Sequence, residues 1–309
     1  MHRQMPVYIL TDCSESMAGE AFEEMTMGIR RLIDELKQNP VALETVTISF
    51  ISFAGSARQE LPLTELIKAH VPRFKLGSGT ALGKALDVLL ESIDRDLTKT
   101  SPLHKGDYKP LCFLLTDGEP TDKWEKSAAK VRSLVDAKKI TVIAVACGPD
   151  VSTEKLKKVT DIVLSLKLSE KNSFKEFFKW ASASIATTSE RIDGTKPINL
   201  PILPEAALEF VDKESHKPIF NRFIFLHAKC SKTRQFYIIR YKRESETDSF
   251  YIPIACHKLE DFDFDGLEGS EEQINVRILS GSLPCPYCNN EIWGVCSCGA
   301  VHCLKGRLC

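Results

Sequence analysis

The chain has 309 residues, a net charge of −1 at pH 7 and 43% hydrophobic residues, which is the composition of an ordinary globular protein with room for two domains. A near-neutral charge balance gives no bulk electrostatic reason to expect binding to nucleic acid or to an anionic membrane. No stretch approaches the roughly 18 apolar residues of a membrane span. No apolar signal segment precedes the first predicted strand. We therefore expect a cytoplasmic protein without a membrane partner.

The first part of the chain alternates predicted strands and helices. Short apolar runs predict strands at 7–11, 46–53, 111–115, 139–147 and 161–166, the last at an edge of the sheet. Apolar residues at three- and four-residue steps predict helices at 18–38, 81–97, 122–137 and 173–188, with shorter ones at 63–69 and near 152. Residues 59–61 are expected to form a hairpin with 46–53. This pattern predicts an α/β fold with a doubly wound, mostly parallel sheet over residues 1–190.

The second part of the chain has a different composition. Residues 191–204 contain several prolines and a glycine, and they predict a linker. A small β-rich unit is expected over 205–280, with strands at 223–228, 236–241, 250–254 and 275–279 and an acidic solvated turn at 260–265. A cysteine-rich tail then occupies 281–309.

Polar side chains follow the first predicted strand directly. Asp12, Ser14 and Ser16 offer one carboxylate and two hydroxyls within five residues, all of them hard oxygen donors that suit Mg²⁺, Mn²⁺ or Ca²⁺. The carboxyl ends of the strands are where open α/β sheets bind ligands. The alternative is that one of the serines caps the helix that follows.

Two later stretches place more oxygen donors at the same predicted edge. Thr80 lies in a glycine-rich loop before a helix, and Asp117 follows the apolar strand at 111–115. Together with Asp12, Ser14 and Ser16, these residues resemble the metal-ion-dependent adhesion site (MIDAS) of the von Willebrand factor A (vWA) domain. The resemblance covers about residues 5–190. It implies that the five residues share one divalent cation, Mg²⁺ or Mn²⁺, with Ca²⁺ as a third candidate.

The cysteines are concentrated at the end of the chain. Six of the eleven fall between Cys285 and Cys309, a clustering that favours a metal site in a reducing compartment over disulfides. Cys-x-x-Cys redox chemistry needs a helix start beside a βαβ unit, and that context is missing. We predict Zn²⁺ bound by four of Cys285, Cys288, Cys296, Cys298 and Cys303, with His302 and Cys309 as further candidates. The remaining cysteines are interpreted as buried thiols: Cys13, Cys112, Cys147, Cys230 and Cys256.

A vWA domain followed by a β-rich unit and a cysteine-rich tail resembles the bacterial tellurite-resistance TerY family over the whole chain, with 205–309 as its C-terminal part. The resemblance implies a role in a bacterial stress or defence system. It also implies partners among protein kinases and PP2C-type phosphatases.

These patterns predict a binding module and not an enzyme. A cation held mostly by neutral oxygens keeps net positive charge, so we expect it to capture a protein partner through an exposed carboxylate or phosphate. The alternative is a metal-dependent hydrolase or phosphatase acting through Asp12. A haloacid-dehalogenase-type phosphatase needs a second aspartate two residues later, where this chain has Ser14. The tail carries too little basic charge to predict nucleic-acid binding.

Overall fold

The structure is a computed structural model that describes residues 3–100, 105–148, 151–167, 172–190, 201, 203–204, 207–211, 223–243, 248–259, 276–296 and 301–304. Described residues up to Val211 form one compact unit, and those from Phe223 onward form another. Each unit contains its own sheet. The predicted linker at 191–204 lies mostly outside the described residues, and the acidic run at 260–265 lies entirely outside them.

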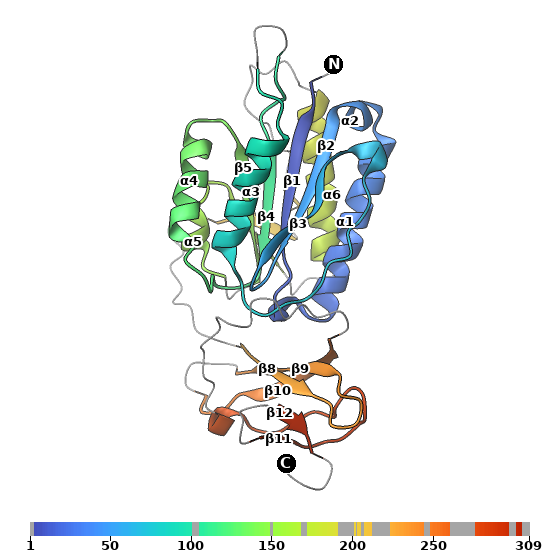
Figure 1. Ribbon diagram of the computed structural model, residues 1–309, viewed down its shortest axis with the longest axis vertical. Helices are drawn as coiled ribbons and strands as arrows, with labels where there is room; N and C mark the ends of the chain where they lie inside the picture. The colour runs from blue at the N-terminus through green and yellow to red at the C-terminus, as the bar shows by residue number, and fades with distance from the viewer. Residues whose placement is uncertain are drawn as a thin grey trace. The chain divides into compact units, whose positions relative to one another are not determined.

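The larger sheet has the strand order β3-β2-β1-β4-β5-β6-β7 and runs through the first unit (Figure 1). The five strands from β2 to β6 in this order are parallel, whereas β3 and β7 pair antiparallel with β2 and β6. The predicted doubly wound, mostly parallel sheet is therefore confirmed. The strands are β1 (Met5–Asp12), β2 (Val46–Phe53), β3 (Ala57–Glu65), β4 (Leu111–Thr116), β5 (Thr141–Cys147), β6 (Val163–Leu166) and β7 (Leu208–Phe210).

Helices cover both faces of this sheet (Figure 1). On one face, Tyr8 of β1 lies in a core cluster with Leu86 of α3. On the other, the ring of Phe113 in β4 meets Phe177 and Trp180 of α6 edge-on, at 6.1 and 6.5 Å between centroids. Because both faces are covered, every residue of β1, β2, β4 and β5 is buried. The helices are α1 (Glu20–Gln38), α2 (Pro40–Thr45), α3 (Leu82–Asp96), α4 (Glu125–Asp136), α5 (Thr153–Lys157) and α6 (Ser173–Glu190).

Two local predictions for this unit were wrong, and one helix was missed. The helix expected at 63–69 is only a 3-10 turn at Leu66–Lys68, because β3 stays paired with β2 as far as Glu65. Helix α2 was not predicted; Asn39 caps it by accepting a 3.0 Å hydrogen bond from the N–H of Ala42. Strand β6 is not an edge, because β7 pairs with it, so Leu208–Phe210 belongs to this sheet and not to a β-rich unit beginning at 205.

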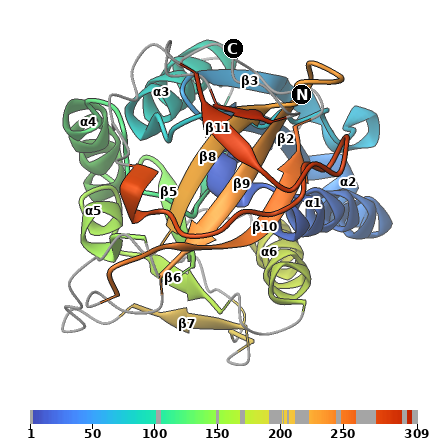
Figure 2. The ribbon, with the colours of Figure 1, turned by 90° about the horizontal axis from the view of Figure 1, so that it is seen from below.

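The smaller sheet has the order β10-β9-β8-β12-β11, and β8, β9 and β10 lie side by side in Figure 2. Its strands are β8 (Phe223–Lys229), β9 (Phe236–Lys242), β10 (Ile252–Lys258), β11 (Trp293–Val295) and β12 (Val301–Cys303). The strand expected at 275–279 is instead a 3-10 turn with a single bridge from Leu279 to Tyr251. Since β11 and β12 come from the tail, the tail at 281–309 and the strands from Phe223 onward share one sheet.

Among the described residues, no helix combines the length and the apolar character that crossing a membrane requires.

Candidate metal sites

The first site lies at the carboxyl ends of β1 and β4, which are adjacent parallel strands. Asp12 ends β1 and is 1% exposed, and Thr116 ends β4. Thr116 Oγ1 donates a 2.6 Å hydrogen bond to Asp12 Oδ2, and the N–H of Ser14 donates one of 2.9 Å to Asp12 Oδ1. Both carboxylate oxygens are therefore oriented before any ion binds.

Burial raises the pKa of Asp12 to about 6, against the opposing effect of the hydrogen bonds from Ser14 and Thr116. Removing a carboxylate from water disfavours its charged form unless an opposite charge lies close by. A divalent cation at this position would supply that charge. The environment of Asp12 therefore fits a cation site.

Two hydroxyls and a second carboxylate converge beside Asp12. Ser16 Oγ donates a 2.7 Å hydrogen bond to Asp117 Oδ1, and Ser14 Oγ lies 2.8 Å from Ser16 Oγ and 3.3 Å from the same carboxylate oxygen. Ser14 precedes the 3-10 turn Glu15–Met17, but its side chain makes no capping hydrogen bond there. The N-cap of α1 is Gly19, so neither serine caps that helix, and both hydroxyls lie beside the Asp117 carboxylate.

Thr80 reaches this edge from a third loop. It is 5% exposed, and its N–H donates a 2.9 Å hydrogen bond to Thr121 Oγ1. A Cβ atom at Gly118 would lie 2.8 Å from Thr80 Oγ1, so only glycine after Asp117 permits this close approach. All five predicted residues therefore lie at one edge of the sheet, Asp12 at the end of β1 and Ser14, Ser16, Thr80 and Asp117 in the loops that meet there.

The same residues fall inside a family match. The model of the von Willebrand factor type A domain matches residues 7–180, more than half of the chain. The chain belongs to the von Willebrand factor type A family. A second model, described as the TerY-C metal binding domain, matches residues 221–308. The chain thus joins a vWA domain to a TerY-C domain, as the sequence resemblance indicated.

Solved structures similar to the vWA domain include proximal thread matrix protein 1 from the mussel byssus, 19% identical with a TM-score of 0.44. Another form of that protein, described with a zinc-occupied MIDAS motif, is 16% identical with a TM-score of 0.43. BatB from Bacteroides thetaiotaomicron is 18% identical, with a TM-score of 0.42. Each match covers 60% of this chain, and the three cover 48%, 46% and 99% of the other chains. The chain thus spans about half the length of the mussel protein. No curated protein matches the sequence.

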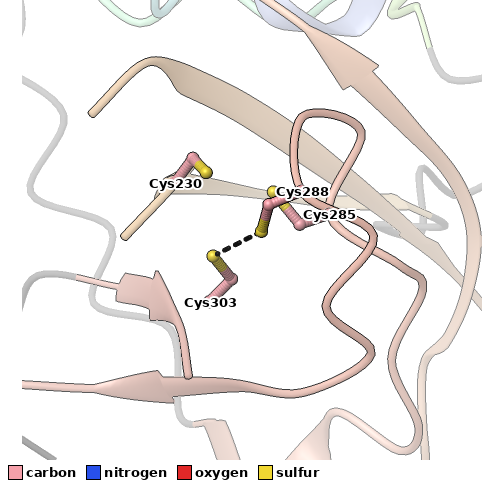
Figure 3. A group of neighbouring side chains, drawn as sticks. All are labelled: Cys230, Cys285, Cys288 and Cys303. Atoms are coloured by element: carbon pink, nitrogen blue, oxygen red, sulfur yellow. Dashed lines mark hydrogen bonds between the residues drawn. The ribbon is translucent and has the colours of Figure 1, made fainter. Parts of the chain in front are cut away.

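The second site is a group of four cysteines in the TerY-C domain. The sulfur atoms of Cys230, Cys285, Cys288 and Cys303 all lie within 4.8 Å of one another, pointing toward a common centre (Figure 3). Tetrahedral zinc with Zn–S bonds of about 2.3 Å separates its sulfurs by roughly 3.8 Å. The Cys288 and Cys303 sulfurs are 3.6 Å apart. The four thiols therefore fit a tetrahedral metal ion.

Backbone and hydroxyl donors surround these sulfurs. The N–H of Thr233 lies 3.4 Å from Cys230 Sγ, and the N–H of Ser231 lies 3.2 Å from Cys303 Sγ. Burial acts to raise the pKa of Cys230, but hydrogen bonds from Thr233 and its neighbours outweigh it and lower that pKa to about 6. Burial raises the pKa of Cys285 to about 12. A bound dication would favour the thiolate form of all four.

The predicted zinc ligands are corrected in one respect. Cys285, Cys288 and Cys303 come together as expected, but the fourth thiol is Cys230, which had been interpreted as a buried thiol. Cys296 and His302 are not members of the group, and Cys298 and Cys309 lie outside the described residues.

The sequence around Cys230 contains a signal that could have indicated a metal ligand. The residue follows an apolar strand and opens the polar turn Ser-Lys-Thr-Arg, where backbone N–H groups are free to face a sulfur. Among the other predicted buried thiols, Cys13, Cys112 and Cys147 are at most 1% exposed. The prediction was wrong for Cys256 in β10, which is only partly buried. The nine described cysteines form no disulfide.

Proposed function

We propose that the chain is a metal-dependent protein-binding module whose vWA site holds Mg²⁺ or Mn²⁺. The ion would be bound through Asp12, Ser14, Ser16, Thr80 and Asp117. The observation that carries this proposal is the convergence of the Ser14 and Ser16 hydroxyls on Asp117, next to the buried Asp12 carboxylate. One oxygen from each of these five residues leaves an octahedral Mg²⁺ or Mn²⁺ with one open position, which an acidic group of a partner can fill.

The expected partner group is a carboxylate or a phosphate. Both present hard oxygens, and a phosphorylated serine or threonine carries more charge than aspartate or glutamate. The TerY resemblance suggests a protein kinase and a PP2C-type phosphatase as candidate partners, in a bacterial stress or tellurite-resistance system. It supports looking for phosphorylated partners first.

The TerY-C cysteines are proposed to hold one Zn²⁺ with a structural role. The sheet of this domain is small, and its core cluster includes Cys285 and Cys303 themselves. Ion binding would therefore join the turns carrying these cysteines to strand β8 and contribute directly to the free energy of folding.

The partner test is a pull-down from the native host, with Mn²⁺ or with EDTA in the buffer. Wild-type protein should retain a partner only with Mn²⁺, and Ser14→Ala and Thr80→Ala should lose partner and ion in parallel. Equal capture in EDTA would contradict a metal-mediated contact. A parallel assay of p-nitrophenyl phosphate hydrolysis addresses the enzyme alternative, since Mn²⁺-dependent turnover lost in Asp12→Ala would favour a phosphatase.

A further inference from the structure

Glu15 lies between the two motif serines in the sequence. The Glu15 carboxylate is half-buried and turns to the glycine-rich loop that carries Thr80. Its Oε1 accepts a 3.1 Å hydrogen bond from Ser78 Oγ, and its Oε2 accepts one of 2.7 Å from the N–H of Gly79. One carboxylate thus binds two consecutive residues immediately before Thr80.

Two other hydrogen bonds attach the backbone of that loop. The N–H of Gly77 donates a 2.8 Å hydrogen bond to the carbonyl of Cys13, and the N–H of Thr80 is held by Thr121. Between these two anchors the chain passes through Gly79 at φ +78°, a left-handed conformation that glycine adopts readily. Glu15 holds this central part, where the backbone would otherwise have the most freedom.

We propose that Glu15 is a positioning residue of the cation site. It holds the Thr80 loop against the Asp12–Ser16 loop before the ion arrives. This inference rests on the proposed function of the vWA site. A loop already fixed in its binding conformation loses less conformational entropy when the ion binds, so the affinity is higher. Because both Glu15 oxygens accept hydrogen bonds from the loop, the residue acts through Thr80 and is not counted among the ligands.

Glu119 offers a matched control. It also follows a motif residue, lying two positions after Asp117, and its Oε1 accepts a 2.8 Å hydrogen bond from the N–H of Ser152. Its other oxygen pairs with Lys155. Glu119 therefore has the same charge and also binds a backbone N–H, but its contacts lead to the start of α5 and not to the Thr80 loop.

The experiment compares Mn²⁺ affinity by calorimetry in Glu15→Ala, Glu15→Gln, Glu119→Ala and Glu119→Gln, with circular dichroism to establish folding. Glu15→Ala should weaken binding about tenfold, the equivalent of about 1.4 kcal/mol. Glu15→Gln should lose less, because its amide oxygen can still accept from Gly79. The Glu119 variants should stay close to wild type.

Hydrogen exchange supplies an independent readout in the ion-free protein. The Gly79 amide should exchange faster than in wild type in Glu15→Ala, and at the wild-type rate in Glu119→Ala. If Glu15→Ala and Glu119→Ala lost equal affinity, a simple effect of negative charge would replace the proposed positioning role of Glu15. Equal losses in Glu15→Ala and Glu15→Gln would have the same meaning. Wild-type affinity in Glu15→Ala would overturn this inference alone, whereas a wild-type protein that binds no Mn²⁺ would overturn the proposed cation site as well.

Discussion

Ser16 and Asp117 lie 101 residues apart in the sequence, yet the Ser16 hydroxyl donates a 2.7 Å hydrogen bond to the Asp117 carboxylate. This bond connects the loop after β1 with the loop after β4. In the ion-free protein, the two side chains satisfy each other, and a cation has to replace their hydrogen bond with coordination to both oxygens. Ion binding at this edge should therefore require side chains from both the loop after β1 and the loop after β4.

Asp12→Asn is expected to abolish Mn²⁺ binding while the ion-free protein remains at least as stable as wild type. The substitution removes the buried negative charge beside Thr116, but the amide oxygen can still accept from the N–H of Ser14, and the amide NH2 can donate to the Thr116 hydroxyl. Calorimetric titration and thermal unfolding measure the two effects. Asp34→Asn, at an exposed position of α1, is the control and should match wild type. Unchanged affinity in Asp12→Asn would contradict the assignment of the site.

Mn²⁺ affinity should fall about tenfold between pH 7.5 and pH 5. Burial raises the pKa of Asp12 to about 6, so at pH 5 the ion has to displace a proton in most molecules. Calorimetry at several pH values tests this, and an affinity constant over that range would contradict it.

The same pKa shift has the opposite consequence for the stability of the ion-free protein. Because the folded pKa exceeds the ordinary value of 3.8, protonated Asp12 favours the folded state. This contribution, on the order of 3 kcal/mol, is complete below pH 3.8 and is lost as the pH rises through about 6. Chemical denaturation of wild type and Asp12→Asn in EDTA isolates the contribution, since only wild type should show it.

Cys230→Ser should lower the zinc content as strongly as Cys285→Ser does. Both sulfurs belong to the four-thiol group, and a site with three thiolates loses a full ligand bond. Cys296→Ser is the matched control, because Cys296 is described and lies outside the group. Elemental analysis of purified variants should give one zinc per chain for wild type and the control. Full zinc content in Cys230→Ser would contradict Cys230 as a ligand and favour a site made only of residues from the cysteine-rich tail.

Chelators should act separately on the two metal sites. Brief EDTA treatment should remove the ion from the oxygen site and leave the larger sheet folded, because the core strands are buried independently of that edge. Prolonged treatment with a zinc chelator should unfold the strands of the TerY-C domain, since metal binding and folding are linked there. Hydrogen exchange followed by mass spectrometry distinguishes the effects of the two treatments. Fast exchange in the strands from β8 to β12 should appear only after zinc removal.

Asp122→Ala should destabilise the protein by about 1 kcal/mol and change Mn²⁺ affinity less than Thr80→Ala does. The Asp122 carboxylate accepts 3.0 Å hydrogen bonds from the N–H groups of Gly83 and Lys84 in the first turn of α3. It therefore stabilises the helix start and does not face the cation site. Urea denaturation and calorimetry measure the two effects. An affinity loss as large as that of Thr80→Ala would instead place Asp122 in the site.

Local patterns of apolar residues were enough to predict most strands and helices of the vWA domain. The apolar runs of β1, β2, β4 and β5 and the periodic faces of α1 and α3 are signals contained within short stretches of chain. The ends of β1 and β4 could be related from sequence because parallel strands place their carboxyl ends at one edge, so Asp12 and Asp117 were expected together. Glu15 had no such signal, since its two hydrogen bonds go to a loop more than 60 residues away.

The TerY-C domain depended on tertiary structure to a greater degree. Strands β11 and β12 have three residues each, too few to show alternation, and only their pairing into the sheet with β8 defines them. The same pairing brings Cys303 to the end of β8, next to Cys230. These two cysteines are 73 positions apart in the sequence. The sequence alone thus predicted a candidate metal site in the tail through Cys285 and Cys288. The fourth thiol was decided by a long-range strand pairing, because hydrogen bonds between distant strands leave no local periodicity to detect.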